Sequence, residues 1–204
     1  MPSSKLLGAV PKDWPSDKVY LHSSSFSKKL GKDKIDGLVF SISDLPPTIQ
    51  VRKTSGPYSS VRIMPVADVA HPANGQHALC ATQHLAPDTF ILPYLGYVHD
   101  QTDADQASDY DLSLDRELGI GVDASDIGNE ARFINDYRGI SQAPNAEFRD
   151  IFVAIAKDKV EKSVGVFVLS AGKSGKRAKG VGRGTEILVS YGKGFWTERQ
   201  LVQD

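Results

Sequence analysis

Cysteine is almost absent from this sequence, in which Cys80 is the only one among 204 residues. A single cysteine excludes an internal disulfide framework and a cysteine-rich zinc cluster within this chain. Long apolar runs are also missing: no stretch approaches the roughly 20 residues of a membrane span. The N-terminus lacks the apolar centre of a secretory signal. We therefore expect a protein of a reducing compartment that is neither secreted nor inserted in a membrane.

The sequence also lacks a large excess of positive or negative charge, since 24 basic residues stand against 25 acidic ones. Such a balance creates no global field that would attract nucleic acid or an anionic membrane. Charge is instead separated along the chain. Residues 99–117 form an acidic insert with seven acidic residues against the single basic Arg116, and residues 171–184 form a loop with five glycines, five basic residues and no acid.

Short apolar, β-branched runs dominate the rest of the sequence and predict a mostly β fold with short helices. Phe90–Val98, Glu147–Ala156 and Val164–Leu169 have the composition of strands. Asn129–Ile134 is long enough for one or two helical turns. No internal repeat is present, which argues against a solenoid or a propeller.

Composition sets the first 60 residues apart from the rest of the chain. Residues 1–60 are rich in serine, lysine and proline, and we expect an N-terminal extension that is partly flexible or forms a helical cap. Residues 61–196 are expected to form the main domain. Residues 197–204 are expected to form a short C-terminal helix or tail.

Four motifs carry the functional information. They are HPANGQHALCAT at His71–Thr82, YLGYV at Tyr94–Val98, GNEARFIN at Gly128–Asn135 and GTEILVSYG at Gly184–Gly192. In this order and at this separation they resemble the signatures of SET-domain protein-lysine methyltransferases. The resemblance is to a small member that lacks the cysteine-rich zinc clusters on either side of the domain. One such motif alone would be weak, whereas four in the expected order are specific.

The resemblance implies a fold of small curved β-sheets with a C-terminal pseudoknot. It also implies methylation of a protein lysine side chain with S-adenosyl-L-methionine as the methyl donor. The favoured substrate class is a histone tail or nucleosome, which would place the protein in the nucleus, with the cytoplasm as the alternative. No metal is implied, and the sequence offers no dedicated base to remove the proton of the substrate lysine.

Matching the motifs residue by residue assigns three groups of site residues. The catalytic residue is expected to be Tyr191, whose hydroxyl would orient the amine. The residues expected to hold the methyl donor are Gly75, Gln76, His77, Ala78, Asn135, Asp136 and Trp196. The residues expected to contact the substrate are Tyr94, Tyr110, Phe148, Val189 and Phe195.

The chain departs from the family pattern at several of these positions. Ala78 replaces the second glycine of the opening loop, Gly75 stands one position early, and Asp136 replaces the usual histidine. Val189 stands where many relatives have an aromatic residue, and Phe148 is a candidate to supply that ring. Two alternatives stay open: a SET-like module that binds chromatin or protein partners without catalysis, and a methyltransferase for a non-histone protein.

Each of the two charged segments can be interpreted either as a functional surface or as an ordinary solvated one. The acidic insert would attract a basic substrate through Asp103, Asp105 and Asp109, although such segments are more often a solvated surface. The basic stretch 173–183 could touch DNA phosphates, but a flexible solubilising loop is the favoured interpretation.

Overall fold

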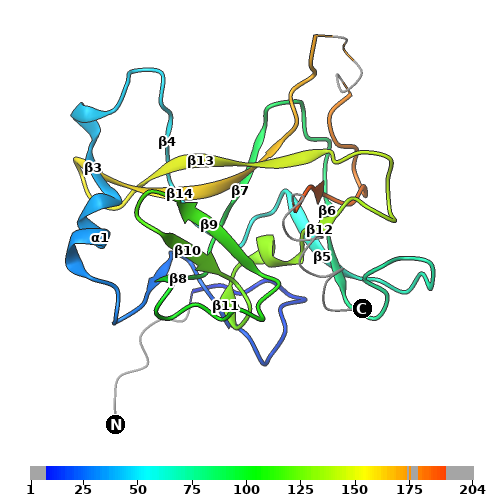
Figure 1. The fold of residues 1–204 in the computed structure, drawn as a ribbon. Helices are drawn as coiled ribbons and strands as arrows, with labels where there is room; N and C mark the ends of the chain where they lie inside the picture. The colour runs from blue at the N-terminus through cyan, green and yellow to red at the C-terminus, as the bar shows by residue number, and fades with distance from the viewer. Residues whose placement is uncertain (1–7, 174, 176–178, 192–204) are drawn as a thin grey trace.

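The computed structural model describes residues 8–173, 175 and 179–191 (Figure 1). The predicted C-terminal helix or tail at 197–204, together with Phe195 and Trp196, lies outside the described residues. Within them the chain is mostly β, as predicted, with several small sheets and one short α-helix. None of the helices in these ranges has the length and apolar composition of a membrane span.

The strands are short, which is why the chain forms several small sheets rather than one large sheet. The helical elements are α1 (Lys32–Gly37), η1 (Ile42–Asp44) and η2 (Glu130–Phe133). The strands are β1 (Val19–Tyr20), β2 (Ser25–Phe26), β3 (Val39–Ser41), β4 (Val51–Arg52), β5 (Val61–Pro65), β6 (His77–Ala81), β7 (Phe90–Tyr94), β8 (Tyr97–Asp100), β9 (Asp111–Asp115), β10 (Ile120–Asp123), β11 (Ile127–Gly128), β12 (Asn135–Asp136), β13 (Ala146–Ala154), β14 (Lys159–Val168) and β15 (Leu188–Val189).

A long antiparallel hairpin of β13 and β14 runs across the molecule (Figure 1). Its register runs from Ala146 opposite Val168 to Ala154 opposite Val160. Strands β3, β4 and β7 extend this sheet, in which β14 pairs with both β3 and β7. The apolar residues of β14 are almost fully buried, because strands flank it on both sides.

A second sheet has the strand order β2-β8-β10-β9 and contains the residues between Tyr97 and Asp123. Gly96 stands where β8 begins, and a Cβ atom there would overlap the backbone oxygen of Asp123. The glycine of the YLGYV motif is therefore needed for the close approach of β8 and β10.

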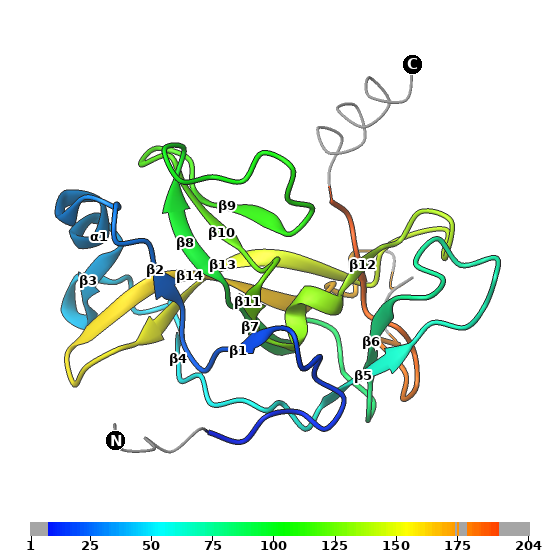
Figure 2. The ribbon, with the colours of Figure 1, turned by 90° about the horizontal axis from the view of Figure 1, so that it is seen from below.

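The N-terminal segment is built into these sheets. Strands β1 and β2 pair with β11 and β8, and strands β3 and β4 pair with β14 and β13 (Figure 2). The only α-helix of residues 8–60 is α1, which has six residues. The described part of the segment is therefore not a helical cap set on a separate domain, and no break in strand pairing marks residue 60.

One buried carboxylate links the N-terminal segment to the GNEARFIN motif. Glu130 is 2% exposed, and its Oε2 accepts a hydrogen bond from the Tyr20 hydroxyl at 2.9 Å. Its Oε1 accepts the backbone N–H of Tyr58, also at 2.9 Å. Burial and the nearby Glu130 carboxylate raise the pKa of both tyrosines, so both hydroxyls stay protonated.

Truncating Glu130 should therefore destabilise the whole domain. In Glu130→Ala both donors lose their acceptor, and we expect the free energy of unfolding to fall by about 2–3 kcal/mol. Urea denaturation followed by tryptophan fluorescence measures this change. The matched control is Glu117→Ala at an exposed position, which should stay within about 0.5 kcal/mol of wild type. Equal stability of the two variants would refute this role for Glu130.

Candidate active site

The two principal motifs meet in space although about fifty residues separate them in sequence. Strand β12 pairs in parallel with β15, so that Asn135 lies opposite Leu188 and Asp136 opposite Val189. The Asn145 side chain reinforces the contact: its Nδ2 donates to the Glu186 carbonyl at 2.7 Å, and its Oδ1 accepts the N–H of Leu188 at 2.9 Å. This meeting of the two segments is the arrangement that the predicted pseudoknot requires.

The first asparagine of GNEARFIN has a structural role that the sequence did not reveal. Asn129 is fully buried, donates from Nδ2 to the Pro93 carbonyl at 2.9 Å, and accepts the N–H of Leu95 at 3.2 Å. It thus satisfies one backbone group near the end of β7 and one in the link from β7 to β8. The motif therefore combines a structural half with a half that faces a cavity.

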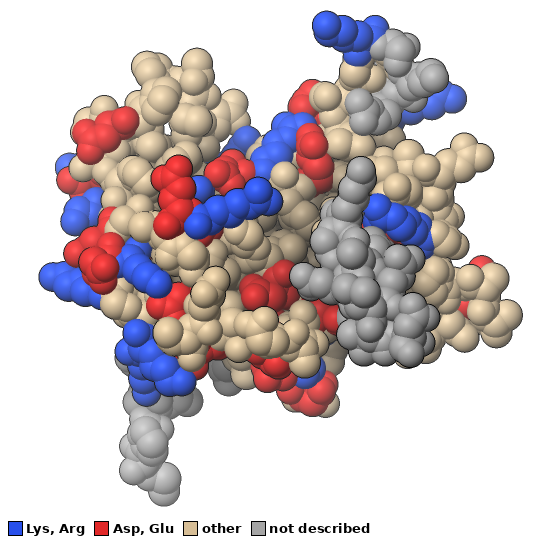
Figure 3. Space-filling view, in the orientation of Figure 1, with Lys and Arg blue, Asp and Glu red and all other residues tan. Residues whose placement is uncertain are grey.

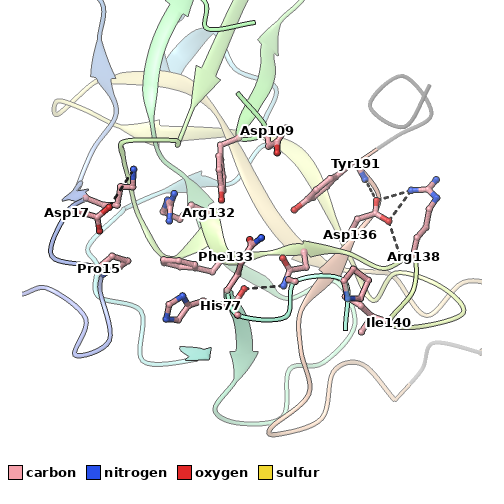
Figure 4. A pocket seen from close by; sticks show the side chains of 17 residues that line it. Pro15, Asp17, His77, Asp109, Arg132, Phe133, Asp136, Arg138, Ile140 and Tyr191 are labelled. Atoms are coloured by element: carbon pink, nitrogen blue, oxygen red, sulfur yellow. Dashed lines mark hydrogen bonds and ion pairs between the residues drawn. The ribbon is translucent and has the colours of Figure 1, made fainter. Parts of the chain in front are cut away.

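A first hollow of about 560 Å³ opens where this second half, the loop before β6 and Tyr191 come together (Figure 4). Five of the residues expected to hold the methyl donor line it: Gly75, Gln76, His77, Asn135 and Asp136. Ala78 does not, because it is 4% exposed within β6. Trp196 lies outside the described residues.

A second hollow, of about 310 Å³, lies on the other side of Tyr191. Three of the residues expected to contact the substrate line it: Tyr94, Tyr110 and Phe148. Val189 is fully buried behind it and lines neither hollow, and Phe195 lies outside the described residues. The two hollows have Asp109, Tyr110, Arg132 and Tyr191 in common, so these side chains stand between them.

Tyr191 is held at both ends. Its hydroxyl donates to the Ile134 carbonyl at 2.7 Å, and its backbone N–H donates to Oδ2 of Asp136 at 2.8 Å. Burial, together with the nearby Tyr110 and Asp136, raises the pKa of the Tyr191 hydroxyl well above its ordinary value. Tyr191 therefore presents a neutral hydroxyl whose direction is fixed. Figure 4 shows the Tyr191 ring pointing into the first hollow.

The side chain of Asp136 links three groups of the site. The carboxylate is 5% exposed and accepts from Nη1 of Arg138 at 2.8 Å, from the Arg138 N–H at 2.9 Å, and from the Tyr191 N–H (Figure 4). A histidine could not accept all of these bonds. The departure from the family pattern thus creates a direct link between β12 and Tyr191.

Glu186 is a site residue that the sequence analysis missed. Its Oε1 accepts from Asn135 Nδ2 at 2.8 Å, and its Oε2 lies 3.1 Å from Nε2 of His71. Nδ1 of His71 accepts the N–H of Ala73 at 3.0 Å, so Nε2 carries the hydrogen that points to Glu186. One carboxylate therefore fixes both Asn135 and the loop at 71–76. Its position within GTEILVSY was the only available clue.

The Arg132 side chain lines both hollows, and its guanidinium is hydrogen-bonded to backbone carbonyls. Its Nε donates to the Ala124 carbonyl at 2.9 Å and its Nη2 to the Ser125 carbonyl at 3.0 Å. The guanidinium lies 4.6 Å from the centre of the Tyr110 ring. These contacts hold Tyr110 at the boundary between the hollows.

The carboxylates of the acidic insert fall into two groups: some form hydrogen bonds and ion pairs within the fold, and others line the second hollow. Asp103 accepts from Lys29 at 2.6 Å, Ser27 at 2.7 Å and Tyr97 at 2.7 Å, and the lysine and the two hydroxyls lower its pKa. It lines neither hollow, and its expected role in attracting a substrate stays a prediction. Asp105 and Asp109 do line the second hollow. Figure 3 shows acidic and basic side chains side by side on the face that carries β9.

Comparison with known proteins identifies the fold. The sequence matches no family model and no curated protein. Polycomb Repressive Complex 2 from Chaetomium thermophilum is structurally similar in two solved states. The apo, autoinhibited complex matches with a TM-score of 0.50 and 19% identity over 72% of this chain and 17% of the other. A humanized mutant bound to an inhibitor matches with a TM-score of 0.50 and 19% identity over 67% and 15%.

The chain thus has the SET-domain fold, as the motifs predicted. It spans less than a fifth of the solved chains that it matches. Among the described residues, no three histidine, cysteine, aspartate or glutamate side chains are placed to hold a metal ion.

Removing the Glu186 carboxylate should loosen the loop that lines the first hollow. In Glu186→Ala, His71 and Asn135 lose their common acceptor, and we expect backbone amides of residues 71–77 to exchange with solvent about tenfold faster or more. Hydrogen–deuterium exchange by mass spectrometry measures this rate. The control is Thr185→Ala, at the exposed neighbouring position. Unchanged exchange in both variants would show that Glu186 does not hold the loop.

Proposed function

We propose that the protein transfers a methyl group from S-adenosyl-L-methionine to a lysine side chain of a protein. The observation that carries this proposal is the pair of neighbouring hollows that Tyr191 lines in common. One hollow is lined by the motif residues expected to hold the donor, and the other by aromatic residues. Two reactants that enter from opposite sides would be aligned with each other, which is the main requirement for such a transfer.

The first hollow fits the donor in size and in chemistry. Its volume of about 560 Å³ lies within the range of small-molecule sites. Phe133 and Ile140 offer apolar surface for an adenine ring. Lys18, which is paired with Asp126, and Arg138, which is paired with Asp136, bring positive charge that suits a carboxylate, and the exposed Asp17 is an acceptor suited to an ammonium group. When bound, the donor supplies an activated methyl group on a sulfonium.

The second hollow fits a long aliphatic chain that ends in a cation. Tyr94 and Phe148 pack edge to face with ring centres 5.7 Å apart, and Tyr110 completes the aromatic lining. Such walls exclude water and favour an ammonium or methylammonium group. The Tyr191 hydroxyl already donates its hydrogen to Ile134, so its oxygen can accept from the substrate amine and direct the nitrogen lone pair.

The lining of the second hollow favours a basic protein segment as the substrate. Asp105, Asp109 and Asp111 line it, and its one cation, Arg132, is bonded to backbone carbonyls. We therefore propose a histone tail or nucleosome as the substrate and the nucleus as the site of action. A basic segment of a non-histone protein is the alternative substrate.

A SET-like binding module without catalysis is the second candidate function. The replacement of the loop glycine by Ala78 and of the histidine by Asp136 favours it. However, Ala78 lies outside the first hollow, and Asp136 supports Tyr191. Binding of the donor separates the two candidates, because a pure module has no use for it.

Replacing Tyr191 by phenylalanine tests the proposal directly. Only a hydroxyl is removed, so the affinity for the demethylated donor product should change by less than about threefold, while turnover should fall on the order of 100-fold. Calorimetry measures the affinity. Radiolabelled methyl transfer onto nucleosomes, free histones and a cell extract measures turnover and identifies the substrate.

The matched control for this experiment is Tyr97→Phe, which removes a hydroxyl that bonds Asp103 away from both hollows. It should keep full activity. A wild-type chain that binds neither the donor nor its demethylated product is a binding module. Full activity of Tyr191→Phe would mean that Tyr191 is not the catalytic residue.

Neutralising the acidic lining should weaken substrate binding without affecting the chemical step. For the double variant Asp105→Asn/Asp109→Asn we expect the Michaelis constant for a basic peptide to rise about fivefold at low salt, and less at high salt. The control is Asp44→Asn, an equal charge change at an exposed position on η1. An unchanged Michaelis constant would show that these carboxylates do not attract the substrate.

A further inference from the structure

A buried imidazole pairs with a carboxylate that lines the second hollow. His99 of β8 is 3% exposed in its side chain, and its Nε2 lies 3.2 Å from Oδ1 of Asp111. Its Nδ1 lies 3.1 Å from the Asp100 carbonyl oxygen. Both ring nitrogens therefore face acceptors. A neutral imidazole has a single N–H and donates to one of the two oxygens; with that hydrogen on Nε2, it holds Oδ1 of Asp111 in place.

The sheet leaves room for this pair at one glycine. Gly121 of β10 lies opposite His99, and a Cβ atom there would stand 2.7 Å from Oδ1 of Asp111 and 3.0 Å from Cε1 of His99. Any larger residue at position 121 would push the two groups apart. The absence of a side chain at this position of β10 is thus what allows the contact.

Asp111 also separates two hollows. It lines the second hollow together with Tyr94 and Tyr191. On its other side it lines an outer hollow of about 320 Å³ on the surface, which His99 shares. The carboxylate is 29% exposed and can therefore exchange protons with solvent. A proton taken from inside the second hollow would have a way out through this side chain.

We propose that Asp111, positioned by His99, is the base that removes the proton of the substrate lysine. This inference rests on the proposed function, because methyl transfer requires a neutral amine. The N–H bond of the ammonium breaks, its electron pair stays on nitrogen, and the proton forms an O–H bond with Asp111. The proton then leaves through the outer hollow to solvent, which restores the carboxylate.

The surroundings of Asp111 strengthen it as a base. Burial is the largest cause that raises its pKa and the neighbouring Asp123 adds to it, whereas His99 opposes them. A base with a raised pKa accepts a proton more readily. The other charged groups that line the two hollows beside it are Asp105, Asp109 and Arg132 on the inner side and Asp100, Asp115 and Arg116 on the outer side.

The test is the pH profile of methyl transfer onto free histones. Asp111→Asn should lower kcat at pH 7 by about 100-fold, with KM changed much less, and the loss should shrink as pH rises, because hydroxide and solvent then deprotonate the lysine. His99→Gln and Gly121→Ala keep the carboxylate but disturb the pair, and both should shift the acidic limb of the profile. Asp36→Asn, an equal charge change at an exposed position of α1, is the control and should match wild type.

A second readout needs no methyl donor. Adding a lysine-containing peptide to wild type should shift the NMR signals of the His99 ring, assigned by comparison with His99→Gln, and should leave them unmoved in Asp111→Asn. A wild-type chain with no transfer onto any substrate overturns the proposed function and this inference together. An active wild type whose pH profile Asp111→Asn leaves unchanged, or in which only KM rises, overturns the inference alone.

Discussion

The parallel pairing of β12 with β15 is the contact on which the candidate site depends. It brings Asn135 and Asp136 beside the segment that ends in Tyr191. Two residues of pairing are weak alone, and the Asn145 side chain adds bonds to Glu186 and Leu188 on the same strand segment. A pair of strands with only two paired residues has few backbone hydrogen bonds and needs side-chain support. Each side-chain hydrogen bond adds about 1 kcal/mol.

Three carboxylates hold the segments of this site in place, and each connects a different pair of segments. Glu186 connects β15 back to the loop at 71–76, Asp136 connects β12 forward to Tyr191, and Glu130 connects η2 to the N-terminal segment. Each accepts at least two hydrogen bonds, which is how a carboxylate away from water is tolerated. The site is thus fixed by hydrogen bonds across segments rather than by the regularity of any sheet.

The sequence predicted the fold class and the residues around Tyr191, because those lie in contiguous motifs whose spacing survives. It did not predict that residues 8–60 join the sheets, since strands of two or three residues are too short for an alternating pattern to show. It also missed Asn129 and Glu186. Their partners, Pro93 and His71, are distant in sequence, and only the fold shows that a polar side chain is satisfied there.

The division of the acidic insert explains why its net charge was a poor guide to its function. Asp100 and Asp103 are paired with lysines of the N-terminal segment, and Asp115 with Lys162 of β14, so these charges hold β8 and β9 in place. With the sheet anchored in this way, Asp111 can face His99 across the gap at Gly121 while Asp105 and Asp109 remain at the second hollow. Asp105, Asp109 and Asp111 line the second hollow, whereas Asp100, Asp103 and Asp115 form ion pairs with lysines. The fold, rather than the sum of the charges, therefore decides which carboxylates of the insert line that hollow.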